Sequence, residues 1–241
     1  MRKLFFDKIN EDSVVITGDE HKHIAYSLRM RKGDALVICC DGVDYSGKIT
    51  EITKDKTFVE IVGKEKSSAE PYSEITLFFG AMKGDKNDYV VQKCVELGVK
   101  KFVPFTSDYC AVKSESIKCE RLNRISLESA KQSGRGFVPT VEEVIKFNDL
   151  LDLLGEYDLV IFPYENEEDC DIREFVANKQ HERVAVIVGS EGGFSNREAD
   201  ELRRIAGGSV TLGSRILRAD TASVAVVSAL MYEWGEWRRK G

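Results

Sequence analysis

Hydrophobic and polar positions alternate in short runs over the first seventy residues of the chain. These runs are rich in β-branched and aromatic residues, which favours strands. Asp41 and Gly42 lie between two of the runs and are typical of a tight hairpin, because both residue types tolerate positive φ. One helix is predicted from Asp19, a good N-cap, through Leu28. The predicted strands are residues 3–9, 13–18, 35–42, 43–52 and 57–63. The pattern predicts a small β-barrel or sandwich with one helix.

A polar segment, Gly63–Pro71, then interrupts the hydrophobic pattern. It contains two adjacent serines and ends in proline, a composition typical of linkers between domains. We therefore expect one domain over residues 1–70 and a second over residues 71–241.

Beyond Pro71, apolar strands alternate with helices. The predicted strands are residues 74–81, 100–105, 157–163, 183–189 and 209–213, and the predicted helices are residues 87–99, 114–132, 194–207 and 221–237. Gly98 is a predicted C-cap, Ser195 and Glu198 form a capping box, and Asp220 or Thr221 is expected to cap the last helix. The run at 183–189 is continuously apolar, as in strands buried on both faces. The second domain is therefore predicted to be α/β with a mostly parallel sheet.

The composition is that of a globular protein, with 42% hydrophobic and 32% charged residues among 241. The longest apolar stretch, 222–232, is too short to cross a bilayer and contains serines. No targeting segment is visible, so we expect a cytoplasmic protein without membrane association. The six cysteines form no C-x-x-C pair, which predicts reduced, buried thiols and no metal site.

A net charge of −6 argues against a protein that coats nucleic acid without specificity. One segment is nevertheless locally basic: Lys22, Arg29, Arg31 and Lys32 have no acidic residue between them. A solvated loop and a nucleic-acid-binding face both explain this cluster.

In open parallel sheets, ligands bind beyond the carboxyl ends of the strands. Three candidate loops follow Phe162, Val188 and Leu212. The second contains Gly189 to Gly193 with Glu191 among the glycines, and it has neither G-x-x-x-x-G-K-[ST] nor G-x-G-x-x-G. Glu191 would repel a pyrophosphate but would accept hydrogen bonds from hydroxyls. A nucleoside with positive charge, such as S-adenosyl-L-methionine (AdoMet), fits this loop. A plain strand–turn–helix connection with Glu191 near the helix N-terminus also fits.

The third loop holds two bulky apolar residues, Ile216 and Leu217, between Arg215 and Arg218. Loops do not often hold such a pair unless it packs against something. An adenine face and the core of the protein are the two candidates.

Five motifs in this chain resemble those of the RsmE-type ribosomal RNA methyltransferases of the SPOUT superfamily. "VGSEGGFSNREADEL" and "LGSRILRADTASVAVVSAL" are similar to the family patterns G-P-E-G-G-F-S and L-G-x-R-I-L-R-x-E-T-A. The other three are Met82–Val99 with K-G-D and E-L-G-V, Ala130–Pro139 with Q-S-x-R, and Leu28–Asp34 with L-R-x-x-x-G-D. Ser190 replaces the usual proline, Asp220 the usual glutamate, and Lys131 stands at an often acidic position.

The resemblance implies a PUA-like β-barrel for RNA followed by a trefoil-knotted domain that binds AdoMet. It further implies a homodimer that methylates a uridine at ring nitrogen 3 in 16S ribosomal RNA, as free RNA or within the small subunit. The implied cofactor residues are Phe162, Gly189, Ser190, Glu191, Gly192, Leu212, Gly213, Ile216, Leu217 and Arg218. Arg218 and Arg135 are the catalytic candidates, because arginine would stabilise charge developing on the uracil oxygens. The implied RNA contacts are Arg29, Arg31, Lys32, Lys83, Lys86, Lys113 and Gln132.

Two other classes of function, an oxidoreductase and a non-catalytic RNA-binding protein, agree less well with the sequence. A nucleotide-dependent oxidoreductase on a doubly wound sheet conflicts with the absent phosphate fingerprints. A non-catalytic RNA-binding protein of the same fold conflicts with the intact motifs around Gly189 and Arg218.

Overall fold

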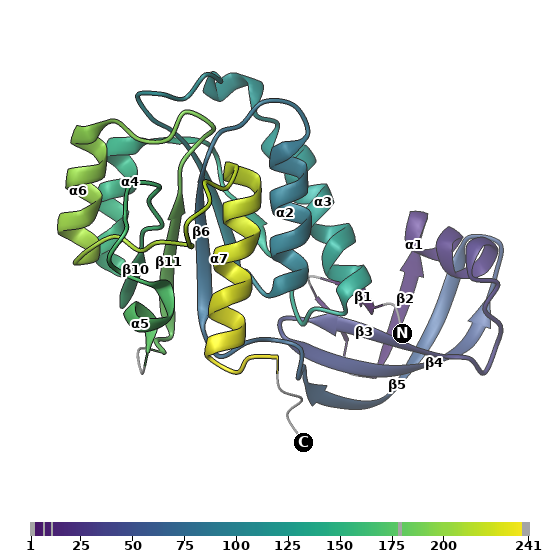
Figure 1. The fold of residues 1–241 in the computed structure, drawn as a ribbon. Coiled ribbons are helices and arrows are strands. Elements are labelled where there is room, and N and C mark those ends of the chain that lie inside the picture. Colours follow the sequence, from purple (N-terminus) through teal and green to yellow (C-terminus); the bar gives the residue numbers. More distant parts are fainter. Residues whose placement is uncertain (1–2, 7, 11, 178–179, 238–241) are drawn as a thin grey trace. The chain divides into compact units, whose positions relative to one another are not determined.

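The computed structural model describes residues 3–6, 8–10, 12–177 and 180–237 (Figure 1). The chain divides into two compact units. The first comprises Met1–Glu70 and Ala130–Val138, and the second Pro71–Ser129 and Pro139–Gly241. The division at Pro71 falls at the end of the polar segment of the sequence. The sequence prediction placed residues 130–138 in the second domain, whereas the structure places them in the first unit.

The first unit is built on one five-stranded sheet. Its strands are β1 (Lys3–Phe5), β2 (Ser13–Thr17), β3 (Ala35–Cys40), β4 (Val43–Ile52) and β5 (Lys56–Lys66). They are ordered β1-β3-β4-β5-β2, so that β1 and β2 form the two edges among the described residues. Only the β1–β3 pair is parallel within this sheet. The predicted hairpin between β3 and β4 is confirmed, with φ of 47° at Asp41 and 74° at Gly42.

The helical segment of the first unit differs from the single helix predicted. A short α-helix, α1 (Gly18–Lys22), continues directly as a π-helical turn, η1 (His23–Ser27). The core beneath it is aliphatic, and its fully buried members include Ile16, Ile24 and Ile38.

The second unit is a parallel sheet covered by helices, as predicted. Its strands are β6 (Glu74–Gly80), β7 (Lys101–Thr106), β8 (Thr140–Val141), β9 (Ile145–Lys146), β10 (Leu159–Ile161) and β11 (Arg183–Val188). The order is β10-β11-β6-β7-β8, and β9 also pairs with β7. All these pairs are parallel. β6 and β11 lie inside the sheet and are buried along almost their whole length, which explains their continuous apolar runs.

The described helices of the second unit match the sequence prediction in part: three begin within two residues of a predicted helix, one begins five residues later than predicted, and two short ones were not predicted. They are α2 (Lys86–Leu97), α3 (Cys119–Ser133, which ends within the first unit), α4 (Phe147–Leu153), α5 (Ile172–Val176), α6 (Asn196–Ala206) and α7 (Ala219–Glu233), with 3-10 turns η2 (Ser114–Ser116) and η3 (Leu154–Glu156). Gly98 caps α2 with φ of 110°, and the Ser195–Glu198 capping box is present. α2 and α7 pack side by side (Figure 1).

Two local predictions were wrong. The strand expected at 209–213 is reduced to single bridges, Val210 with Pro163 and Thr211 with Asp171. Both partners lie beyond the end of β10, where the chain is no longer extended, so a continuous ladder cannot form. The last helix begins one residue before Asp220, so its N-cap position is Arg218, whose side chain makes no capping hydrogen bond, rather than Asp220 or Thr221.

The cysteines match the prediction in part. All six are free; Cys39, Cys94 and Cys119 are buried, whereas Cys40, Cys110 and Cys170 are half-buried. Burial, followed by the neighbouring carboxylate of Asp44, raises the pKa of Cys39 to about 12, so this thiol stays protonated at neutral pH. Within the described ranges, no helix is long and apolar enough to traverse a bilayer, and no cluster of His, Cys, Asp and Glu could hold a metal ion.

Candidate functional site

The loop that follows β10 is joined to the segment that leads into Leu212–Arg218. The amide of Tyr164 donates to the carbonyl oxygen of Val210 at 3.0 Å, and the amide of Val210 donates to that of Phe162 at 2.9 Å. The Ser209 hydroxyl donates to Glu167. This hydrogen bond, helped by the amides of Asp169 and Cys170, lowers the pKa of Glu167. The loop after β10 is therefore bonded to Ser209 and Val210, which immediately precede the third candidate loop.

The glycines after β11 are required by close neighbours in the protein. A Cβ on Gly192 would lie 2.5 Å from the carbonyl oxygen of Tyr109. On Gly193, which has a φ of +68°, it would lie 2.6 Å from Oε1 of Glu165. Glu165 belongs to the loop after β10, so this contact brings the second candidate loop to the first. The convergence of loops expected from a parallel sheet is thus present in the structure.

Glu191 is engaged by the segment that begins α2. Its Oε1 accepts hydrogen bonds from the Lys86 ammonium at 2.8 Å and from the Lys83 amide at 3.2 Å. Burial by itself would raise the pKa of this carboxyl group, but the bonds from Lys86 and Lys83 together lower it. Glu191 therefore links the glycine loop to α2, a contact between residues about a hundred positions apart that the sequence did not indicate.

Ser190, the departure from the family pattern, is 5% exposed. Its Oγ has no hydrogen-bond partner among the described residues. The backbone here is tightly packed, since a Cβ on Gly80 at the end of β6 would lie 2.2 Å from the Ser190 nitrogen. Buried hydroxyls normally have partners, so this one fits a site whose partner comes from outside the chain.

The other cofactor candidates differ in what they offer a ligand. Phe162 is fully buried and packs edge-on against Phe194 at 5.3 Å between ring centroids, so its backbone alone is available. Ile216 is 85% exposed, which an apolar side chain tolerates best when a ligand or partner covers it. Leu212 and Leu217 are half-buried, and Gly213 and Arg218 are exposed. Arg218 stands at the N-terminus of α7, where the helix dipole adds positive potential.

The second unit contains a cavity of about 420 Å³, and only one of its three predicted RNA-binding lysines lines it. Lys83 lines it, together with Lys118 and Arg121. Lys86 is used by Glu191, and Lys113 is exposed. The cofactor candidates do not line this cavity.

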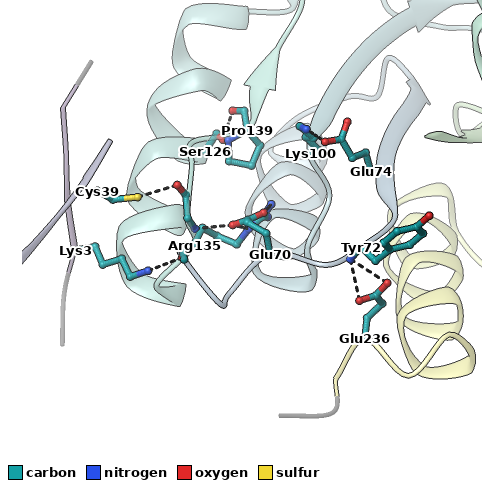
Figure 2. Close-up of polar contacts among 12 residues, drawn as sticks. Lys3, Cys39, Glu70, Tyr72, Glu74, Lys100, Ser126, Arg135, Pro139 and Glu236 are labelled. Atoms are coloured by element: carbon teal, nitrogen blue, oxygen red, sulfur yellow. Dashed lines mark hydrogen bonds and ion pairs between the residues drawn. The ribbon is translucent and has the colours of Figure 1, made fainter. Parts of the chain in front are cut away.

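The remaining predicted residues belong to the first unit. Arg29, Arg31, Lys32 and Gln132 are exposed. Arg135 is only 3% exposed, and its Nε and Nη2 donate to Glu70 at 2.9 and 2.7 Å (Figure 2). Sequence reasoning missed Glu70, because nothing in a polar linker marks one carboxylate as the partner of an arginine 65 residues away.

Comparison with known families matches both parts of the chain. Residues 68–231 match the model of a family described as an RNA methyltransferase domain. Residues 16–62 match one described as an RNA methyltransferase PUA domain.

The chain is also similar, over nearly its whole length, to individual methyltransferases. The chain is 32% identical to a ribosomal RNA small subunit methyltransferase E of Bacillus subtilis, covering 90% of this chain and 89% of that protein. It is 31% identical to the protein of that name from Aquifex aeolicus, covering 96% and 99%. A crystal structure of the Neisseria gonorrhoeae protein of that name, bound to S-adenosyl methionine, matches with a TM-score of 0.87 and 27% identity over 99% of this chain and all of that one.

Proposed function

The chain belongs to the RNA methyltransferase family, and we propose that it uses AdoMet to methylate ring nitrogen 3 of a uridine in 16S ribosomal RNA of the small subunit. The observation that carries the proposal is that the loop after β10 contacts the glycine loop at Gly193 and bonds to Ser209 and Val210, just before the Leu212–Arg218 segment. The names of the relatives support the small-subunit substrate, and the five sequence motifs support the uridine position.

The residues present fit AdoMet. When bound, AdoMet supplies a methyl group activated by a sulfonium. Backbone groups of Gly189, Leu212 and Ile216 would hold the adenine edge, and Leu217 would pack on a face of the ligand. Ser190 offers a buried hydroxyl without a partner among the described residues. Glu191, by contrast, is occupied by Lys86, and we propose that it positions the glycine loop.

Arg218 is the residue proposed to act on the substrate. The imide nitrogen of uracil is a poor nucleophile until its proton leaves, and the resulting charge spreads onto two carbonyl oxygens. The paired donors of an arginine stabilise such charge, and the N-terminus of α7 acts in the same direction. Arg135 would have to leave both hydrogen bonds to Glu70 before it could touch a substrate, so the proposal rests on Arg218.

The RNA would contact cationic residues in both units. Lys83, Lys118 and Arg121 line the cavity of the second unit together with Asp85 and Asp88. Arg121 is paired with Asp88, so Lys83 and Lys118 are the cations proposed to contact an RNA phosphate there. Lys113 and the exposed Gln132 are further contacts in this proposal.

We also propose that the enzyme is a cytoplasmic homodimer. α7 carries small, half-buried residues at Val224, Ala225, Ser228 and Ala229, and an exposed Tyr232, a surface that a second copy of the chain would cover. Sedimentation equilibrium measures the mass of the protein in solution, and the mass of a monomer at micromolar concentration would contradict the homodimer.

Transfer of radiolabelled methyl from AdoMet to small subunits and to free 16S RNA tests the function, with mass mapping of the product. Arg218→Ala is expected to lower kcat about a hundredfold or more, and AdoMet affinity measured on the same variant separates this loss from its implied contact with the cofactor. The matched control is Arg204→Ala, an exposed arginine on α6 outside the candidate loops, which should retain turnover. Methyl transfer to another ring position, or full turnover by Arg218→Ala, would overturn the corresponding part of the proposal.

A further inference from the structure

The first unit exposes an aromatic side chain in the segment that holds its basic cluster. Tyr26 lies in the π-helical turn η1, and 62% of its surface is accessible. π-helical turns occur frequently at functional sites. Exposed aromatic rings beside cations are typical of proteins that bind single-stranded nucleic acid.

The Tyr26 ring is supported by a buried histidine. His21 is packed in the interior, with Nδ1 2.8 Å from the Thr57 hydroxyl and Nε2 3.2 Å from the carbonyl oxygen of Lys54. Because a carbonyl only accepts, Nε2 carries the hydrogen. The two rings form a T-shaped pair with centroids 6.1 Å apart, and the Tyr26 hydroxyl donates to the same Lys54 oxygen at 3.3 Å. The tyrosine is therefore held by its ring and by its hydroxyl.

This support leaves a ring face open. A T-shaped contact covers at most one face of an aromatic ring. With most of the residue accessible, the other face is available to a planar group. A ring held in place before binding loses little conformational entropy when a base stacks on it.

The backbone that carries the neighbouring cations is also held by hydrogen bonds. The amides of Leu28 and Met30 donate to the carbonyl oxygens of His23 and Ile24 at 2.9 and 3.1 Å. Between them, Arg29 has a φ of 53°, a left-handed conformation that is costly for a residue with a side chain and that persists where its surroundings impose it. The amide of Arg31 donates to Asp34 at 2.8 Å.

These backbone bonds leave the cationic groups directed to solvent. Arg29, Arg31 and Lys32 are exposed, and within the described residues no ion pair involves their side chains. Strained backbone that displays an unpaired cation is consistent with a binding role.

We propose that Tyr26 is a stacking platform for an unpaired base of RNA, and that Arg29, Arg31 and Lys32 hold the adjoining phosphates. The inference rests on the proposed function, because it takes RNA as the substrate. Every base has a π face, so this platform selects single-stranded RNA over a duplex without reading the sequence. It thereby assigns the first unit a preference for unpaired segments of the substrate.

Binding of the full chain to a labelled single-stranded RNA of about twelve nucleotides, compared with a duplex of the same length, tests the platform. Tyr26→Ala is expected to weaken single-strand binding about tenfold or more, while Tyr26→Phe and Tyr26→Trp retain it. Tyr72→Ala is the matched control, since Tyr72 is 58% exposed and lies in the second unit. Melting temperatures of all variants show whether each is folded.

Salt dependence separates stacking from charge. Tyr26→Ala should leave the slope of log affinity against log salt unchanged, whereas Arg31→Ala should reduce it by about 0.7. Wild-type affinity in Tyr26→Ala, an equal loss in Tyr26→Phe, or an equal loss for the duplex would each overturn the inference. If the wild type transfers no methyl group but Tyr26→Ala still loses RNA affinity, the proposed function fails and the platform stands. If the wild type methylates RNA and Tyr26→Ala binds it equally well, the platform alone fails.

Discussion

At the scale of single residues, Ser190 is the proposed cofactor residue whose side chain is least satisfied within the described protein. Its hydroxyl is buried without a partner among the described residues. Such a group loses its bonds to water on folding, which costs about 1–3 kcal/mol. The neighbouring glycines have close contacts with Tyr109 and Glu165, but no contact within the described protein uses the Ser190 hydroxyl. A polar group of a bound cofactor would give this hydroxyl a hydrogen-bond partner.

Ser190→Ala is therefore expected to stabilise the ligand-free protein by about 1 kcal/mol, because the unpaired hydroxyl is removed. The same substitution should weaken AdoMet binding. Thermal unfolding measures both effects, since a ligand of the folded state raises Tm, and NAD and ATP serve as negative controls. A destabilised ligand-free variant with unchanged AdoMet affinity would show that the hydroxyl has a partner within the hydrated protein.

At the scale of elements, the glycine loop and α2 are joined by a charged contact. Glu191 lies in the loop after β11, Lys86 at the first position of α2, and the two side chains are each about one-third exposed. An ion pair exposed to this extent contributes about 1 kcal/mol at most. We expect the ion pair to matter more for the position of the glycine loop than for the stability of the whole protein.

The pH dependence of this contact follows from the lowered pKa of Glu191. A carboxyl group with a depressed folded pKa contributes stability above its unfolded value, here 4.5, and that contribution disappears as the pH falls through the folded pKa. Glu191→Gln should therefore lower the free energy of unfolding at pH 7 by about 1 kcal/mol or less. The difference from wild type should vanish in strong acid.

The matched control for this measurement is Glu96→Gln, which removes the exposed Lys93–Glu96 pair on the same helix. Glu191→Gln is also expected to weaken AdoMet binding, because the glycine loop loses the contact proposed to position it, and Lys86→Met should reproduce both effects. Glu96→Gln should leave AdoMet affinity unchanged. Equal losses of AdoMet affinity in Glu191→Gln and Glu96→Gln would contradict a specific role for the loop contact.

The elements that could be predicted from sequence are those with local causes. Gly98, the Ser195–Glu198 capping box and the buried runs of β6 and β11 each act within a few residues, and each is present as expected. The strand predicted at 209–213 is reduced because Val210 and Thr211 form only single bridges, to Pro163 and Asp171. Contacts such as Glu191 with Lys86 depend on which loops the fold brings together, which no local pattern encodes.

At the scale of the whole molecule, the chain leaves the first unit at Glu70 and returns to it over Ala130–Val138. Gly136 is the centre of this return. Its carbonyl oxygen accepts from the Gly42 amide at 3.1 Å and from the Cys39 thiol at 2.8 Å, and its amide donates to Glu70 at 2.5 Å. A Cβ there would lie 2.7 Å from Ser67. The first unit therefore includes a segment about sixty residues away in sequence.

The Arg135–Glu70 pair completes this attachment, and removing one member should damage it. Arg135→Ala leaves a partly buried carboxylate without its cation, which typically costs about 3 kcal/mol or more. We expect a clear fall in Tm, with AdoMet affinity retained below the transition because the cofactor loops belong to the second unit. Since loss of both charges removes the uncompensated one, Glu70→Gln combined with Arg135→Met should recover much of the stability. If Arg135 were catalytic instead, Arg135→Ala would keep the wild-type Tm, and the stable double variant would have no turnover. Unfolding curves and methyl transfer measured on the same proteins therefore decide between the two roles.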